Sequence, residues 1–286
     1  YLINQTSYTS GLLFRYGVRY DENRIGTDSE AFISLNKFNP SLGVSYSISK
    51  SDNIYFSTGT SFETPTLNEL SNNPNGNGLN KSLDPSSSIN YEIGWRKTTS
   101  NLTFESIVYL INTDNEILPY ELEQFPGKNF YRNVGSTRRY GIEISSQLLF
   151  SSGKLNLSYT KAKNTFNDFV LDGNDLNGMS LPGIPDQILD IELIFNLSNR
   201  GILLINNRLI GDIYADNLNE TMVSSYNLLN ITYSKKIFKN SEVYLGVNNL
   251  LDIAYFDNIR INAFGKRYYE PAPKRNIHFG LNFSFW

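Results

Sequence analysis

Residues 276–285, near the end of the chain, alternate strictly between two kinds of side chain. The apolar positions are Ile277, Phe279, Leu281, Phe283 and Phe285, and the polar or small ones are Asn276, His278, Gly280, Asn282 and Ser284. Successive side chains of a β-strand point to opposite faces, so this period of two predicts a strand with one apolar face. A strand that crosses a bilayer needs roughly 9–11 residues, apolar toward lipid and polar toward the lumen. The stretch meets both requirements.

The same period recurs along the whole chain. It predicts about twelve strands, in addition to a strand fragment at residues 1–7. The predicted strands cover residues 14–20, 42–48, 54–60, 89–96, 102–111, 139–150, 155–160, 188–197, 202–210, 228–234, 243–249 and 276–285. No segment shows a competing helical period of 3.6 residues.

The connections between these strands fall into two length classes that alternate. Short turns lie near residues 51–53, 99–101, 151–153, 198–201 and 238–241. Long polar loops lie at about residues 21–39, 62–87, 112–137, 164–183, 212–225 and 251–274. In an up-and-down meander every second connection lies on the same side, as in outer-membrane barrels with short periplasmic turns and long outer loops.

The expected fold is therefore all-β: a segment of an antiparallel up-and-down transmembrane β-barrel. A soluble β-sandwich or propeller also has alternating strands. Their loops do not usually sort into two length classes, and no repeating blade is visible in the sequence. The loop pattern therefore favours the membrane barrel.

The amino-acid composition narrows the classes of protein to which this chain can belong. The chain of 286 residues has no cysteine, which excludes a disulfide framework and thiolate chemistry. A formal net charge of -3 argues against nucleic-acid binding. The mean hydropathy is -0.33, and without a run of about 18 apolar residues no transmembrane helix is expected. Because the sequence begins at Tyr1 rather than Met, we expect a processed chain or a piece of a longer protein.

Short motifs rich in Asn, Gly and Pro stand at the ends of the predicted strands. They are Phe62-Glu63-Thr64-Pro65 with Asn68-Glu69-Leu70, Leu83-Asp84-Pro85 with Tyr91-Glu92-Ile93-Gly94, Asn133-Val134-Gly135 with Tyr140-Gly141-Ile142-Glu143, Leu181-Pro182-Gly183-Ile184-Pro185, Asn248-Asn249-Leu250-Leu251-Asp252 with Tyr255, and Pro271-Ala272-Pro273-Lys274-Arg275. Together, and in this order, they resemble the C-terminal barrel half of TonB-dependent outer-membrane receptors. Two positions depart from the family pattern, Glu63 where Arg is frequent and Lys274 where Gly is frequent.

The resemblance implies that residues 1–286 are the C-terminal portion of a receptor barrel domain. Such a barrel has 22 strands around a plugged lumen, so about twelve strands would be a little over half of it, open without the missing strands. No stretch of the sequence reads as the plug or as a TonB box. In the complete barrel the final strand would close against the first, with Trp286 at the periplasmic rim. One edge of that strand is therefore expected to be free here.

The resemblance also implies a function, TonB-energised uptake of a scarce nutrient such as a ferric siderophore or a similar metal chelate. The implied location is the outer membrane of a Gram-negative bacterium. The implied partners are outer-membrane lipid, the chelate, and the TonB complex through the missing plug, and no cofactor is expected. Alternatives remain open: a self-contained pore or autotransporter translocator, an outer-membrane enzyme, and a soluble adhesion sandwich.

Candidate ligand-binding residues lie in the long loops, where aromatic rings occur beside Arg and Asn. This combination suits an organic, anionic chelate. We predict ligand contacts at Tyr120, Tyr131, Arg132, Tyr214, Asn217, Tyr255, Arg260 and Arg267. The alternative interpretation is that these side chains form an interfacial aromatic belt or stabilise the loops themselves.

The sequence offers little for catalysis or metal binding. The only histidine, His278, lies on the polar face of the final strand, and no serine is indicated within hydrogen-bond reach of it. Residues 211–219 are acidic, and a solvated loop is a better interpretation there than a cation site. Charged residues predicted on the polar faces of strands, where they would form charge networks in the lumen, are Arg15, Arg19, Glu92, Arg96 and Glu143.

Overall fold

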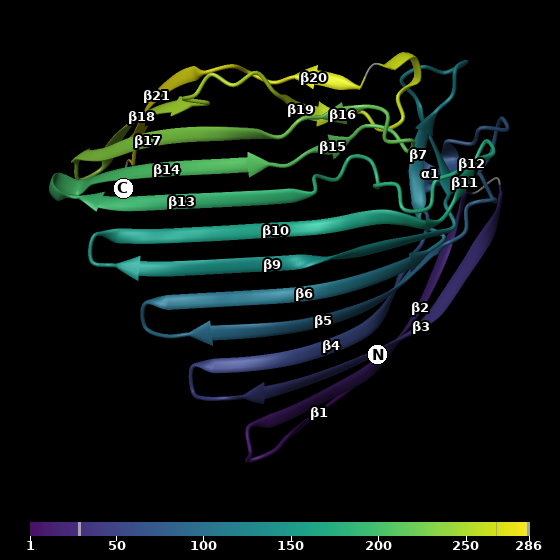
Figure 1. Cartoon of the computed structure of the whole chain (residues 1–286), viewed down its shortest axis with the longest axis horizontal. Coiled ribbons are helices and arrows are strands. Elements are labelled where there is room, and N and C mark those ends of the chain that lie inside the picture. The colour runs from purple at the N-terminus through teal and green to yellow at the C-terminus, as the bar shows by residue number, and fades with distance from the viewer. Residues whose placement is uncertain (28–29, 267, 285–286) are drawn as a thin grey trace.

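The computed structural model describes residues 1–27, 30–266 and 268–284, and within them one antiparallel sheet of 13 strands dominates (Figure 1). In chain order the strands are β1 (Leu2–Ser7), β2 (Leu12–Thr27), β3 (Glu30–Ser47), β4 (Asp52–Glu63), β5 (Ser86–Thr98), β6 (Leu102–Asp114), β9 (Ser136–Phe150), β10 (Gly153–Asp168), β13 (Gln187–Leu197), β14 (Gly201–Ile210), β17 (Tyr226–Phe238), β18 (Ser241–Asn248) and β21 (Asn276–Phe283). This count confirms the prediction of about twelve strands plus an N-terminal fragment. No helix in the described ranges is long and apolar enough to cross a bilayer.

The sheet is an up-and-down meander, as predicted. Each strand pairs with the strands that precede and follow it, apart from small hairpins inserted in the loops. The short turns lie at one end of the sheet and the long loops at the other (Figure 1). Among the described residues β1 and β21 have one strand neighbour each, at opposite edges, so the sheet is an open segment. The free edge expected for the final strand is therefore present, whereas Trp286 lies outside the described residues.

The prediction of a long loop at residues 21–39 is wrong. β2 and β3 continue through it and remain paired as far as Thr27 and Glu30. The rings of Tyr20 and Phe38 lie 4.8 Å apart on this hairpin, and Arg19 pairs with Asp21 at 2.9 Å. The many charged side chains are typical of a loop, which explains the wrong prediction. In the structure they bind each other along the strand surface, and the hydrogen bonds between the two backbones continue.

Several of the other long loops contain structure of their own. The inserted elements are α1 (Leu67–Ser71), β7 (Ile117–Glu121), β8 (Asn129–Asn133), β11 (Val170–Leu171), β12 (Asn174–Asp175), β15 (Ile213–Tyr214), β16 (Met222–Val223), β19 (Phe256–Ile259), β20 (Tyr269–Pro271) and the 3₁₀ turn η2 (Phe264–Lys266). A further 3₁₀ turn, η1 (Ser198–Arg200), forms a short connection. Helix α1 begins with a capping box, in which the Thr66 hydroxyl accepts from the Glu69 N–H and the Glu69 carboxylate accepts from the Thr66 N–H.

The two faces of the sheet differ in polarity, as the alternation predicts. One face, here called the apolar face, carries Ile93, Val108 and Phe279, which keep 62%, 57% and 73% of their surface exposed. On the opposite, polar face the Asn156 side chain accepts from Gln147 at 2.9 Å and donates to Glu192 at 2.6 Å. The strand registers place Arg15, Arg19, Glu92, Arg96 and Glu143 on this polar face, as predicted.

The polar face carries the predicted charge networks. Arg96 forms an ion pair with Glu105 at 2.5 Å, and the Tyr55 hydroxyl donates to Glu92 at 2.6 Å. By contrast, the fully buried apolar side chains lie in the long loops or at the loop ends of strands. They form four clusters, of which the largest contains Val134, Phe166, Phe169, Leu176 and Leu181. The sheet therefore leaves its apolar face uncovered while the loops pack among themselves.

A charge in the middle of the apolar face tests whether this face meets lipid. We expect Val108→Arg to lower the free energy of unfolding of the whole protein in lipid vesicles by about 2–4 kcal/mol, the cost of a cation near the bilayer midplane. The matched control is Ser145→Arg, on the polar face of β9 (Ser136–Phe150), which should cost much less. The measurement is the denaturant midpoint, and equal shifts for the two variants would contradict the assignment of the faces.

Candidate functional site

The long-loop end of the sheet is closed by loops that bind one another, here called the loop cap. The cap comprises residues 112–135, 169–186, 211–225 and 249–275. Asn262 joins two distant loops, because its side-chain amide donates to the Pro119 carbonyl at 3.3 Å and to the Asn217 side chain at 3.1 Å. The Asn219 amide donates to the Ser180 carbonyl at 2.9 Å and accepts from the Ser180 N–H at 2.7 Å. Four segments are thus joined by side-chain amides.

Among the described residues that form ion pairs in the loop cap, Glu121 has the most buried side chain. Its side chain is only 1% exposed and accepts from the Arg260 guanidinium at 2.7 Å. The backbone N–H groups of Gly127 and Phe264 also donate to this carboxylate, at 3.0 and 3.3 Å. A buried carboxylate is stable only when charge and hydrogen bonds compensate its lost hydration, and here three donors do so. This contact, which we call the Glu121 clasp, fastens β7–β8 to the last loop.

The predicted ligand contacts on the β7–β8 hairpin lie on its two faces. The Arg132 guanidinium stacks over the Tyr120 ring, 3.8 Å from the ring centre. Tyr131, on the other face, packs against the buried cluster that contains Leu70 and Leu79. The structure therefore brings Tyr120 and Arg132 together and places Tyr131 in a supporting contact.

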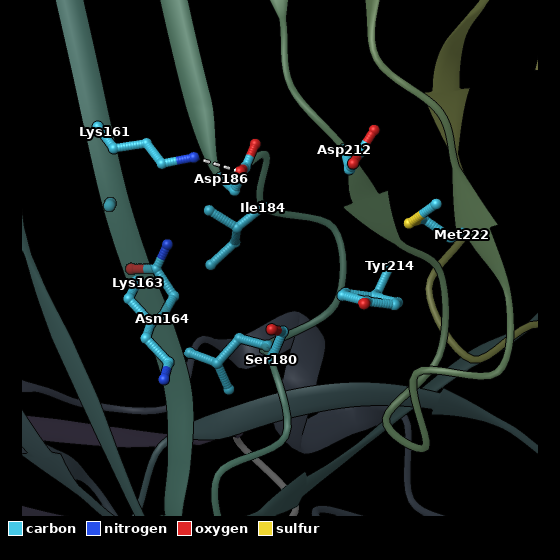
Figure 2. A pocket seen from close by; sticks show the side chains of 11 residues that line it. Lys161, Lys163, Asn164, Ser180, Ile184, Asp186, Asp212, Tyr214 and Met222 are labelled. Atoms are coloured by element: carbon cyan, nitrogen blue, oxygen red, sulfur yellow. Dashed lines mark hydrogen bonds and ion pairs between the residues drawn. The ribbon is translucent and has the colours of Figure 1, made fainter.

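The two predicted residues of the third loop have different environments. Asn217 is 7% exposed, and its amide groups are engaged with Asn262. Tyr214 is half-buried and lines a pocket of about 330 Å³ between β10 and the β15–β16 hairpin. Figure 2 shows this pocket, with Lys161 and Lys163 on one side and Tyr214 on the other.

The last loop holds the remaining candidates. The Tyr255 ring lies 4.8 Å from the ring of Tyr226, and burial followed by the nearby Asp257 charge raises the pKa of the Tyr255 hydroxyl. Arg260 belongs to the Glu121 clasp, and Arg267 lies outside the described residues. Tyr214 and Tyr255 line two different pockets. Asn217 and Arg260 hold loops together in this structure.

Sequence reasoning missed the two residues that organise the cap, Glu121 and Asn262. Their partners are up to 143 residues away, and no local pattern indicates such contacts. The acidic stretch 211–219 is structured by Asp216, whose carboxylate accepts from the N–H groups of Glu220 and Thr221 at 3.1 and 2.8 Å. Its polar groups thus shape the loop. The prediction of a solvated loop is wrong at Asp216, because this residue is buried, with 9% of its surface exposed.

Solved structures of known proteins share the fold of this chain. The crystal structure of the siderophore receptor PiuA from Acinetobacter baumannii superposes with a TM-score of 0.77 at 19% identity, covering 98% of this chain and 42% of that one. The ferric-catecholate import receptor Fiu from Escherichia coli K12 gives 0.74 at 18% identity, covering 98% and 43%. The ferric yersiniabactin uptake receptor FyuA from Yersinia pestis gives 0.75 at 16% identity, covering 97% and 44%. At these identities the likeness establishes the fold.

Sequence comparison agrees with the fold. A relative described as a probable TonB-dependent siderophore receptor PiuA, from Acinetobacter baumannii, is 22% identical over 307 aligned residues, which cover 100% of this chain and 40% of the relative. The chain thus spans about two fifths of the length of the relatives that it matches. Residues 1–250 match the family described as "TonB dependent receptor-like, beta-barrel". The chain therefore belongs to the TonB-dependent receptor β-barrel family.

Proposed function

We propose that this chain is the C-terminal part of the barrel domain of an outer-membrane receptor in a Gram-negative bacterium, with residues 1–286 forming one structural unit. The receptor takes up a ferric siderophore or a similar metal chelate with energy from TonB. The observation that carries this proposal is the family match over residues 1–250. The sheet supports it independently, because one face is apolar and exposed while the other is polar and hydrogen-bonded.

The proposal implies three partners that act at different places. Outer-membrane lipid covers the apolar face of the sheet. The chelate binds at the loop cap, where aromatic rings and guanidinium groups are available for an organic anion. The TonB complex acts through a plug domain that residues 1–286 do not include.

Within the cap, the eight candidate contacts are not equivalent. Arg132 has no carboxylate partner among the described residues and presents a guanidinium stacked on the Tyr120 ring. It is therefore the best candidate for an anionic group of the chelate, with Tyr214 and Tyr255 as neutral contacts elsewhere. Arg260 and Asn217 contribute by holding the loops in place, and Tyr131 by anchoring the β7–β8 hairpin.

Two of the alternative functions, a self-contained pore and an outer-membrane enzyme, each need a feature that the structure does not favour. A self-contained pore would need β1 to pair with β21, and among the described residues β1 pairs with β2 alone and β21 with β18 alone. A hydrolase would need a nucleophile at His278, whose recorded neighbours are the Asn248 amide at 3.4 Å and the Tyr244 ring. We therefore propose a transport role without catalysis.

The proposed function is tested by iron-limited growth. A strain that lacks the gene for the whole protein should fail to grow on at least one ferric chelate as its only iron source, and the intact gene should restore both growth and uptake of radioactive iron. Uptake should also cease when TonB is removed, because the plug would not move. Normal uptake of every tested chelate by the deletion strain would contradict the proposal.

The availability of Arg132 leads to a prediction about affinity. We expect Arg132→Gln to weaken binding of an anionic ferric chelate by about tenfold or more, since a charged hydrogen bond contributes about 1.5–3 kcal/mol. The control is Lys128→Gln on the same hairpin, where the ammonium lies over the rings of Phe125 and Phe130. Titration of the purified receptor by tryptophan fluorescence measures both affinities. Equal affinities in the two variants would remove Arg132 from the binding site.

The Glu121 clasp leads to a prediction about loop mobility. Glu121→Gln keeps the shape but removes the charge that compensates Arg260. A hydrogen bond to a charged group contributes about 1.5–3 kcal/mol. Because its loss makes local opening easier, hydrogen exchange at the Gly127 and Phe264 amides should accelerate roughly ten- to hundredfold. The control is Glu123→Gln, an exposed carboxylate in the same loop. Hydrogen exchange with mass spectrometry distinguishes the two, and identical exchange would show that the clasp does not hold the cap.

A further inference from the structure

The loop between β4 and β5 carries two consecutive Asn-Gly pairs, within residues 72–80 directly after helix α1. They are Asn75-Gly76 and Asn77-Gly78, and all four residues are exposed. Helix α1 lies at the long-loop end of the sheet (Figure 1), and the segment continues from it. A short exposed stretch of Asn and Gly has few contacts that restrict its backbone. Neighbouring side-chain and backbone atoms of each pair can therefore approach one another.

The reactive groups of both pairs have no other partners. Gly76 and Gly78 have φ angles of +125° and +89°, which L side chains rarely adopt. No atom from another part of the chain lies within 4 Å of the position that a Cβ on Gly76 would take. Among the described residues, neither glycine N–H donates a hydrogen bond, and the side chains of Asn75 and Asn77 have no hydrogen-bond partner. These groups are thus free to move and to react.

The third Asn-Gly pair of the chain, Asn177-Gly178, is held by hydrogen bonds. The Asn177 side-chain oxygen accepts from the Phe169 N–H at 3.0 Å, and the Asn177 N–H donates to the Asp175 carboxylate at 3.0 Å. The Gly178 N–H donates to the Phe166 carbonyl at 2.9 Å. The structure therefore fixes, in this pair, the same groups that are free in the other two.

The segment that follows the two free pairs is anchored. Leu79 is 7% exposed and belongs to a buried cluster with Leu70. The next residue, Asn80, donates its N–H to the Leu70 carbonyl at 2.7 Å. A small change of backbone length within residues 75–78 is thus separated from the packed part of the loop. Chemical change at the free pairs would leave these anchors in place.

We propose that Asn75 and Asn77 are sites of spontaneous deamidation. In each reaction the backbone nitrogen of the following glycine bonds to the side-chain carbonyl carbon, and the side-chain nitrogen leaves as ammonia with the proton of that backbone nitrogen. One water molecule then opens the cyclic imide at either carbonyl, which gives aspartate or isoaspartate. Each change adds one negative charge to a chain whose formal net charge is -3. This chemistry depends on the loop alone and not on the transported ligand.

The difference between the free and the fixed pairs predicts a difference in rate. Asparagine is one of the thermally labile residues. Ring closure requires its side chain to turn toward the glycine nitrogen, and at Asn75 and Asn77 no hydrogen bond of these groups has to break first. At Asn177 the bonds to Phe169 and Phe166 must open before the ring can close. We expect deamidation at Asn75 and Asn77 to be about tenfold or more faster than at Asn177.

The test follows all three pairs in one sample of the whole purified protein, incubated folded at neutral pH in water labelled with heavy oxygen. Each new carboxyl group takes one oxygen from this water, so mass spectrometry of the digested protein identifies the changes that occurred during incubation. Enzymatic methylation of isoaspartate identifies the rearranged product. In the variant Asn75→Gln with Asn77→Gln, both signals should disappear from residues 72–80, because the longer side chain closes a ring much less readily.

Faster deamidation at Asn75 and Asn77 than at Asn177, with isoaspartate among the products, would support the proposal. Equal rates at the three pairs in the folded protein would overturn it. Aspartate without isoaspartate would also overturn it, because direct hydrolysis of the side chain gives no rearranged product. In denaturant the difference should disappear, since Asn177 then loses its hydrogen bonds. A difference that persists there would contradict the structural explanation.

Discussion

The rest of this structure depends on the backbone hydrogen bonds between neighbouring strands, which run across the sheet from β1 at one edge to β21 at the other. Apart from the outer edges of β1 and β21, these hydrogen bonds satisfy the polar backbone groups of the 13 strands without any contribution from side chains. Side chains on the apolar face are therefore not needed to hold the sheet together. They are left to meet the surroundings, as the exposure of Ile93 and Phe279 shows. Polar groups on the other face bind one another across strands, so the two faces are stabilised in different ways.

The loop cap is built on the opposite principle. It has little regular structure and depends on side chains, including small apolar clusters around Leu176 and Ile213 and a buried carboxylate at Glu121. The sheet supplies a rigid rim, and the cap supplies surfaces that can vary without disturbing the ladder. In many proteins the residues that bind ligands lie on loops, because the scaffold fixes the two ends of each loop and leaves its sequence free to vary.

Most of the sheet could be predicted from the sequence because its signal is local. Alternation over a few residues decides strand and face, and the registers confirm Arg96 and Glu143 on the polar face. The same local reasoning failed at residues 21–39, where charged side chains hid a continuing ladder. It also could not find Glu121, since the contact with Arg260 depends on how distant loops meet. The roles proposed for Tyr214 and Tyr255 remain predictions because their environments identify no ligand.

The Glu121 clasp has a consequence for the order in which the protein assembles. Its two side chains are 139 residues apart in the chain, so the β7–β8 hairpin is synthesised long before Arg260 exists. Closing so long a loop is costly unless intervening strands have already paired and brought the ends together. Until then the Glu121 carboxylate lacks its Arg260 counter-ion. The sheet must therefore form first and the cap last, which makes a fastened cap a marker that the last loop has reached its place.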